Sequence, residues 1–220
     1  MFIGHFALGF GAKKAAPAVS LGTLFLACQF ADLLWPTLVL TGVERVDVAP
    51  GITAMTPLDF VSYPYSHSLA ALCMWGVAVG GVYALTRRAR AVAALTLVLL
   101  VISHWALDVL THRPDMPLTL NGPARLGLGL WHSIPATLAV ELVVFGAGLA
   151  LYLRTTSARD RIGSIGLWTL VAFLLIVYAA STFGPPPPSS AAVAWSAEAL
   201  WLLVVWGYWV DNHRIPNRNT

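Results

Sequence analysis

The stretch ARAVAALTLVLLVISHWALDVL, residues 89–110, decides the class of this protein. Almost all of it is apolar, and about 20 such residues in a helix cross the roughly 30 Å hydrocarbon core of a bilayer. The stretch therefore predicts a membrane-spanning helix. Its second half nevertheless carries two ionisable side chains, His104 and Asp108, at a depth where a bilayer tolerates charge least.

Five further stretches have the length and apolar character of a span. They are Ser20–Leu40, Tyr65–Thr86, Gly127–Leu153, Ile162–Phe183 and Ala191–Val210, in addition to Ala89–Leu110. The run Phe2–Ala12 is apolar but reaches only about half way across, at about 1.5 Å per residue. Lys13 and Lys14 follow this run, which is the wrong order for a signal peptide. We expect an all-α integral membrane protein with six transmembrane helices and a short N-terminal re-entrant or half-spanning helix.

Composition supports this class and excludes others. Hydrophobic residues make up 58% of the 220 residues and charged residues 10%, whereas a soluble domain carries roughly 25% charge. The sequence therefore excludes a soluble globular protein and a disordered one. The net charge of +3 is too small and too dispersed to predict nucleic-acid binding. Cys28 and Cys73 lie in apolar runs and indicate neither a disulfide framework nor a thiolate metal site.

Basic residues alternate between the ends of the expected spans in a way that fixes their orientation. The groups that should face the cytoplasm are Lys13 and Lys14; Arg87, Arg88 and Arg90; Arg154, Arg159 and Arg161; and Arg214 and Arg218. This predicts a bacterial inner-membrane protein with a cytoplasmic C-terminus. Residues 1–220 should form one domain, in which residues 1–153 carry a metal-site bundle and residues 154–220 add two scaffold helices and a tail.

The strongest local motif is Ser103-His104-x-x-x-Asp108-x-x-x-His112. Spacings of four and eight place its three ionisable side chains on one helical face. A histidine and a carboxylate four residues apart can bind one metal ion from a single helix. The alternative is a buried hydrogen-bonded pair that only fixes helix packing. Within a membrane helix, the metal interpretation is favoured.

Other spans bring polar side chains to a similar depth. We expect His67 near the outer end of the second span and His132 near the outer start of the fourth span. Asp32 should lie at or just beyond the middle of the first span. His5 should rise about 12 Å from the cytoplasmic side. This convergence predicts a site towards the outer face.

Several further residues have two readings of equal weight. Glu141 is either a site carboxylate or one that bonds a hydroxyl on a neighbouring span, and His132 is either a ligand or an interfacial residue beside Trp131. Arg113 and Arg125 either bind an anionic substrate or are ordinary surface charges.

At these residues the chain resembles the YdjM-like family of membrane-bound, metal-dependent hydrolases. The resemblance covers about the first two-thirds of the chain. It rests on Gly4-His5, on Asp32 in Asp32-Leu33-Leu34-Trp35-Pro36, on Ser66-His67-Ser68, and on Ser103-His104-x-x-x-Asp108-x-x-Thr111. The chain departs from the commoner pattern in its single acid at Asp32 and in the aromatic residue before Ser66.

The order of these residues is also similar, more distantly, to the zinc-dependent phospholipase C and single-strand nuclease superfamily. That resemblance implies metal ligands at His5, Asp32, His67, His104 and Asp108, and a further site from His112, His132 and Glu141. It implies a divalent cofactor, zinc foremost, of one to three ions. Asp32, Asp108 and Glu141 would then serve as catalytic carboxylates, and Ser66 and Ser68 would contact substrate.

The leading hypothesis is a membrane-embedded hydrolase of a phosphoester in a lipid or lipid-linked substrate at the outer leaflet. One alternative is a proton- or ion-coupled transporter that uses the same buried histidines and aspartates. Another is a non-enzymatic membrane scaffold with a structural metal.

Overall fold

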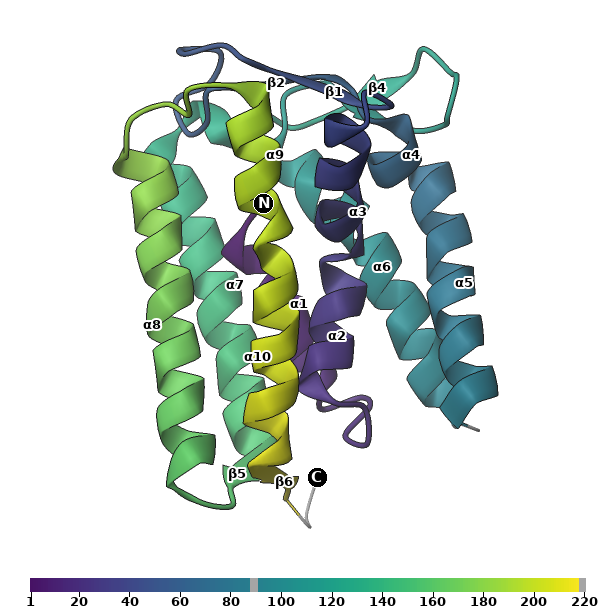
Figure 1. The fold of residues 1–220 in the computed structure, drawn as a ribbon, viewed down its shortest axis with the longest axis vertical. Helices are drawn as coiled ribbons and strands as arrows, with labels where there is room; N and C mark the ends of the chain where they lie inside the picture. Colours follow the sequence, from purple (N-terminus) through teal and green to yellow (C-terminus); the bar gives the residue numbers. More distant parts are fainter. Residues whose placement is uncertain (88–90, 218–220) are drawn as a thin grey trace.

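A computed structural model describes residues 1–87 and 91–217 as a bundle of helices under a cap of short strands (Figure 1). Arg88, Arg90 and Arg218, which the sequence analysis used as topology markers, lie outside the described residues. The helices of the bundle are α1 (Ile3–Ala12), α2 (Leu21–Cys28), α3 (Phe30–Leu40), α4 (Pro64–His67), α5 (Leu69–Arg87), α6 (Ala91–Thr111), α7 (Ile134–Thr155), α8 (Arg161–Phe183), α9 (Ser190–Glu198) and α10 (Leu200–Asn212).

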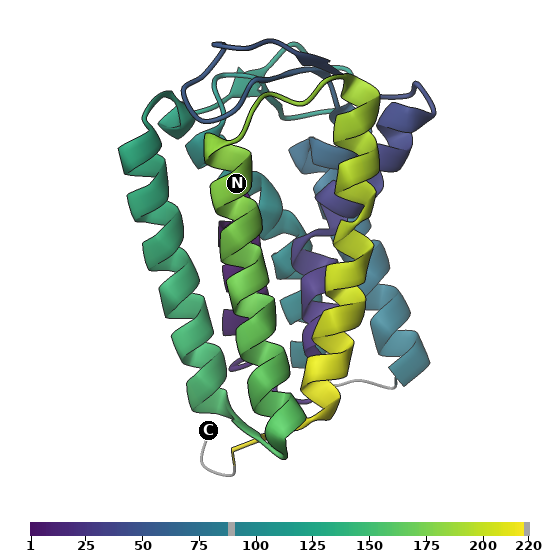
Figure 2. The ribbon, with the colours of Figure 1, turned by 60° about the vertical axis from the view of Figure 1, so that its left-hand side comes forward.

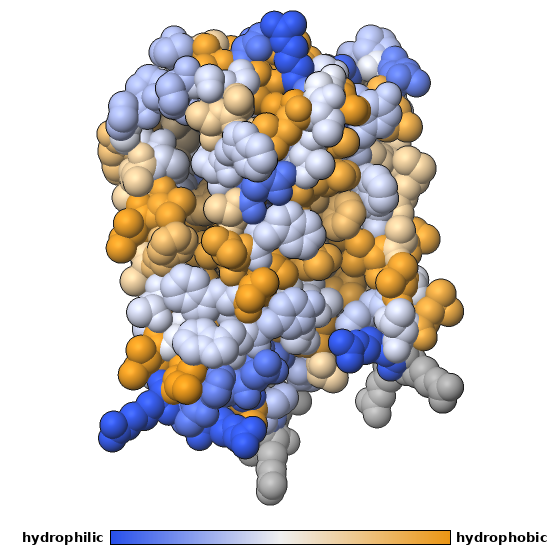
Figure 3. All heavy atoms as spheres, viewed as in Figure 1, coloured by the Kyte–Doolittle hydropathy of each residue, from blue (hydrophilic) through white to orange (hydrophobic). Residues whose placement is uncertain are grey.

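Within the described residues, five helical segments are long and apolar enough to cross a membrane: α5, α6, α7, α8 and the combined segment Ser190–Asn212. The pair α2–α3 becomes a sixth if it counts as one span, although its two helices meet at 56°. The middle of the molecule is largely hydrophobic in the space-filling view, and hydrophilic residues gather at its ends (Figure 3). The expectation of a mainly helical protein is confirmed, and its long apolar helices support the expectation of a membrane protein.

Four expected spans differ in detail. The second is divided at Ser68, between α4 and α5, and the last at Ala199, between α9 and α10. The first is broken at Gln29, between α2 and α3, although no proline or glycine stands there. The fourth begins at Ile134, seven residues later than expected, because Gly129 adopts a left-handed backbone with φ of 72° and the hydroxyl of Ser133 caps the helix at Ala136 N.

The cap consists of two hairpins and a short 3-10 helix. β1 (Arg45–Val48) pairs with β2 (Leu58–Ser62), and β3 (Met116–Pro117) pairs with β4 (Arg125–Leu126), both antiparallel. The 3-10 helix covers Leu130–His132. At the opposite end, β5 (Thr156–Ala158) pairs with β6 (Arg214–Pro216) and joins the ends of α7 and α10 (Figure 1).

The short helix α1 lies inside the bundle. It packs against α2, α6, α7 and α8, and Ile3, Phe6 and Phe10 are fully buried. Phe10 contacts the rings of Phe25 and Tyr152 at 5.0 and 5.2 Å between centroids. A helix of ten residues thus contributes mainly to the core, and its N-terminal half reaches the polar cluster described next.

Candidate metal centre

Four side chains from three helices converge inside the upper half of the bundle. Asp32 lies in the first turn of α3, His67 ends α4, and His104 and Asp108 lie one turn apart on α6. His104 and Asp108 are buried, as is His67, while Asp32 keeps 25% of its side chain exposed. We call these four residues the ligand cluster.

The ligating atoms of the cluster lie at the separations that a shared cation requires. His104 Nε2 is 3.2 Å from Asp108 Oδ2 and 3.7 Å from Asp32 Oδ1. His67 Nε2 is 3.4 Å from Asp32 Oδ1 and 4.0 Å from Asp108 Oδ2. Tetrahedral zinc ligands with bonds of about 2.0–2.1 Å stand about 3.3 Å apart. The contacts of 3.2 and 3.4 Å are close to this spacing, and those of 3.7 and 4.0 Å are wider.

Hydrogen bonds behind His104 determine which nitrogen faces the cluster. Its Nδ1 lies 2.9 Å from the carbonyl oxygen of Cys28, which can only accept, so Nδ1 carries the proton. A neutral His104 then presents an Nε2 lone pair to two carboxylates. This buried Nε2 makes no hydrogen bond to any of the described residues. A lone pair facing carboxylate oxygens is unfavourable unless a proton or a cation lies between them, and the cluster fits a cation.

The Nδ1 of His67, on the side of the ring away from the cluster, also has a hydrogen-bond partner. The hydroxyl of Ser66 donates to Glu44 Oε2 at 2.5 Å, so it accepts from His67 Nδ1 at 2.7 Å. Glu44 is buried, and its other oxygen accepts the backbone N–H groups of Tyr65 and Ser66. A chain from carboxylate to hydroxyl to imidazole thus directs His67 Nε2 into the cluster.

His5 adds a third imidazole. Its ring stacks on His104 at 3.7 Å between centroids with only 4° between planes, and its Nε2 lies 3.0 Å from Asp108 Oδ1. The Met1 amino nitrogen also pairs with this oxygen. Two overlapping groups can therefore hold a metal ion: His5, His104 and Asp108; and Asp32, His67 and His104.

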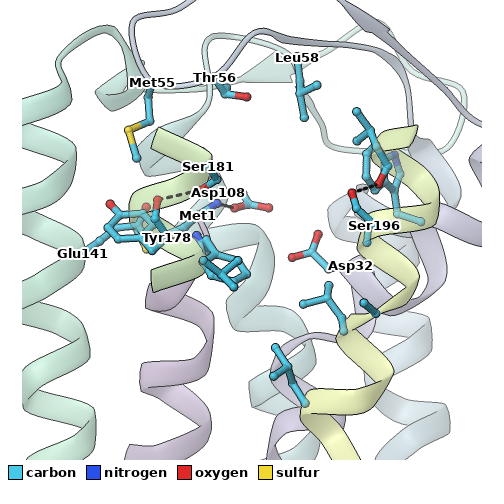
Figure 4. A pocket seen from close by; sticks show the side chains of 18 of the residues that line it. Met1, Asp32, Met55, Thr56, Leu58, Asp108, Glu141, Tyr178, Ser181 and Ser196 are labelled. Atoms are coloured by element: carbon cyan, nitrogen blue, oxygen red, sulfur yellow. Dashed lines mark hydrogen bonds and ion pairs between the residues drawn. The ribbon is translucent and has the colours of Figure 1, made fainter. Parts of the chain in front are cut away.

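Glu141 lies at the N-terminus of α1, whereas the other two predicted catalytic carboxylates, Asp32 and Asp108, lie in the ligand cluster. Its Oε2 accepts the backbone N–H groups of Phe2 and Gly4, at 3.0 and 3.2 Å, which holds the N-terminus of α1 against α7. It also lines the cavity over the cluster (Figure 4). Glu141 is thus adjacent to the site but belongs to neither of the two groups that can hold a metal.

His112 joins a separate network in the cap. Its Nδ1 lies 3.0 Å from Asp115 Oδ1, which also accepts from the hydroxyl of Tyr63 at 2.9 Å. Burial lowers the pKa of His112 below its ordinary value, against the opposing effect of Asp115. The pKa of Asp115 is lowered despite its burial, because His112, Arg113 and Tyr63 hydrogen-bond to its carboxylate.

The remaining predicted site residues lie away from the ligand cluster. His132 is exposed on the 3-10 helix, and Arg125 is exposed on β4. Arg113 pairs with Asp59 and, at 2.9 Å, with Asp115. Ser68 is buried and caps α5, since its hydroxyl accepts from Ala71 N at 3.1 Å.

A cavity of about 690 Å³ lies directly over the cluster. Asp32, His67 and Asp108 line its inner end, and apolar residues of α8, α9 and α10 line much of the rest. Figure 4 shows Glu141 and Tyr178 on one side of this space and Asp32 on the other, with Met55, Thr56 and Leu58 of the cap above. The cavity is of the size that takes a small organic ligand.

Comparison with profiles of known protein families, with curated proteins and with solved structures finds no match for this chain.

Proposed function

We propose that the protein is a membrane-embedded, metal-dependent hydrolase of a phosphoester in a lipid or lipid-linked substrate. The observation that carries the proposal is the meeting of His67 Nε2 and His104 Nε2 with the carboxylates of Asp32 and Asp108 at the closed end of an apolar cavity. Polar ligating atoms next to an apolar wall suit a molecule with an ionic head and a hydrocarbon part.

The residues present fit one or more divalent ions, and zinc suits their nitrogen and oxygen donors best. Asp32, His67 and His104 would hold one such ion, and His5, His104 and Asp108 form a second possible position that shares His104. A bound ion of this kind neutralises phosphoryl charge and makes water a better nucleophile near neutral pH.

The chain's own residues supply the remaining functions. Cys28 O and Ser66 fix the imidazoles of His104 and His67, so that neither ring must reorient during the reaction. Asp32 is the most exposed member of the cluster and faces the cavity, which suits it to accept a proton from attacking water. The apolar walls exclude bulk water from the reacting phosphate.

We further propose six spans, with α2–α3 as one bent span and α1 as a half-spanning helix inside the bundle. The end that carries Lys14, Arg159 and the β5–β6 pair then faces the cytoplasm. The cap and the ligand cluster then lie towards the outer face of a bacterial inner membrane, and the substrate comes from the outer leaflet.

Metal analysis of the detergent-purified protein tests the proposal. We expect stoichiometric zinc or another divalent ion in the wild type and its loss in His104→Ala and Asp108→Asn. His213→Ala is the matched control, because His213 lies near the far end of the bundle and pairs with Asp160. We also expect a panel of lipid phosphates to yield a product that disappears with a chelator and returns with the metal.

Other results would overturn this proposal. Unchanged ion content in His104→Ala and Asp108→Asn would exclude the ligand cluster as the metal site. Ion flux in proteoliposomes that Asp108→Asn abolishes, without hydrolysis of any lipid phosphate, would favour a transporter instead.

A further inference from the structure

We infer that the apolar arm of the cavity is a lateral entrance that binds the hydrocarbon chain of a membrane lipid phosphate. The inference rests on the proposed function for the identity of the headgroup. We call this arm the α8–α10 slot and define it by Phe173 and Val177 of α8 and Leu200, Leu203 and Trp206 of α10.

The slot has a closed lower end. Trp206 Nε1 donates to the carbonyl oxygen of Gly166 at 3.2 Å, and its ring packs on Phe173 at 5.7 Å between centroids. At the same level the ring of Trp209 on α10 packs closely against Gly166 of α8. Above them α8 and α9–α10 separate towards the cap, as both ribbon views show (Figures 1 and 2).

The slot is open to the lipid-facing surface along its side. Phe173 and Leu202 line the cavity, yet they remain 43% and 69% exposed. Figure 3 shows this face hollowed between the two helices. The opening lies between two of the segments apolar enough to cross a membrane, so it faces the hydrocarbon region of the bilayer. An apolar opening at that depth is filled by hydrocarbon, since water there gains no hydrogen bonds.

The inner end of the slot leads to polar groups. Tyr178 and Ser181 continue the α8 wall upwards towards Asp108 and Glu141, and Ser196 faces them from α9 (Figure 4). A lipid whose chain lies between Phe173 and Leu203 therefore brings its headgroup to the ligand cluster without leaving the membrane plane. The cavity holds the headgroup and the first part of one chain, and the rest of the lipid remains in the bilayer.

Blocking the slot from either wall tests this inference. Val177→Trp fills it from α8 and Leu200→Trp from α10, since both residues belong to the slot and line the cavity. The matched control is Ile176→Trp, because Ile176 is the neighbouring residue on α8 and is 66% exposed on the outer surface. The probe is hexadecyl phosphate with a diazirine at mid-chain, crosslinked in detergent micelles and mapped by mass spectrometry.

We expect wild type and Ile176→Trp to crosslink at α8 and α10 within the slot. Val177→Trp and Leu200→Trp should lower this labelling about tenfold, the effect of losing the burial of roughly two methylene groups. Their melting temperatures should stay near that of the wild type.

Equal labelling of all four proteins, or labelling spread over the outer surface, would overturn the inference. Labelling confined to the slot in a wild type that hydrolyses no phosphoester would support the lipid site and overturn the proposed hydrolase. The two failures are thus distinguishable.

Discussion

The hydroxyl proton of Ser66 determines which nitrogen of His67 faces the other residues of the ligand cluster. Ser66 gives its proton to Glu44 and must therefore accept from His67 Nδ1. Without the hydroxyl, Nδ1 would have no such acceptor, and the ring could rotate or exchange tautomers. A residue outside the ligand cluster can thus control the geometry of one within it.

Removing this hydroxyl should weaken metal binding while leaving the fold intact. We expect Ser66→Ala to reduce zinc affinity by about 10- to 100-fold, the usual cost of losing an outer partner of a histidine ligand. Competition with a chromophoric chelator measures this change. Ser62→Ala, at an exposed position on the neighbouring strand, should have no effect. Wild-type affinity in Ser66→Ala would show that the hydroxyl does not orient the ring.

The sequence indicates the inner residues of the site better than its outer supports. His104 and Asp108 are recognisable because ionisable side chains are energetically unfavourable inside a bilayer, so a pair of them within an apolar run indicates a function. Glu44 gives no such signal, since it lies in a polar loop, and only the return of the chain at Tyr65 and Ser66 buries it. His132 has the expected residue type but lies on the exposed surface.

At the scale of elements, the position of α1 depends on its close contact with α7. A side chain at Gly148 would stand 2.1 Å from the carbonyl oxygen of Ala7, which leaves no room for even one methyl group. His5 is on the same short helix and stacks on His104. Displacing α1 should therefore move one imidazole of the site.

Two glycines of α7 allow a matched test. Gly148→Ala should lower the free energy of unfolding by about 1–3 kcal/mol, as overpacked cores do, and should also weaken metal binding. Gly146→Ala should leave stability unchanged or raise it by up to about 1 kcal/mol, because its added methyl group meets nothing within 4 Å among the described residues and alanine favours a helix more than glycine does. Thermal melting in detergent and metal titration measure both effects. Equal behaviour of the two variants would contradict the packing argument.

Element boundaries were harder to predict than element types. Apolar length identifies the long helices, because a bilayer imposes that length. It does not locate the bend at Gln29, which carries no helix-breaking residue, nor does it separate the apolar residues from Gly127 to His132 in the cap from the helix that follows them. Tertiary packing and backbone conformation determine these features.

At the scale of the whole molecule, one ion pair joins the two ends of the described chain. Lys13 Nζ bonds Asp211 Oδ2 at 2.7 Å, and it also donates to the carbonyl oxygen of Val19. Tyr152 donates to the other oxygen of Asp211 at 3.0 Å, and Arg214 lies over the ring of Tyr152. The network joins α1, α7 and α10 at the end opposite the ligand cluster.

Two adjacent lysines therefore differ in role. Lys13 is buried and Lys14 exposed, so we expect Lys13→Met to destabilise the protein by roughly 3 kcal/mol, because it leaves Asp211 without its cation. Lys14→Met should be close to neutral. Thermal unfolding of both variants in the same detergent gives the comparison, and similar melting temperatures would refute the assigned roles. From the sequence alone, both lysines could be interpreted only as markers of the cytoplasmic side.

The enclosure of α1 has a consequence for the order of assembly during translation. Of the elements described, this helix leaves the ribosome first. Its partners α6, α7 and α8 are synthesised later, as is Asp211, which pairs with Lys13. An apolar helix too short to span the bilayer has no stable place until they arrive. The position of His5 beside the ligand cluster is therefore fixed late in biogenesis, after α7, α8 and Asp211 have been synthesised.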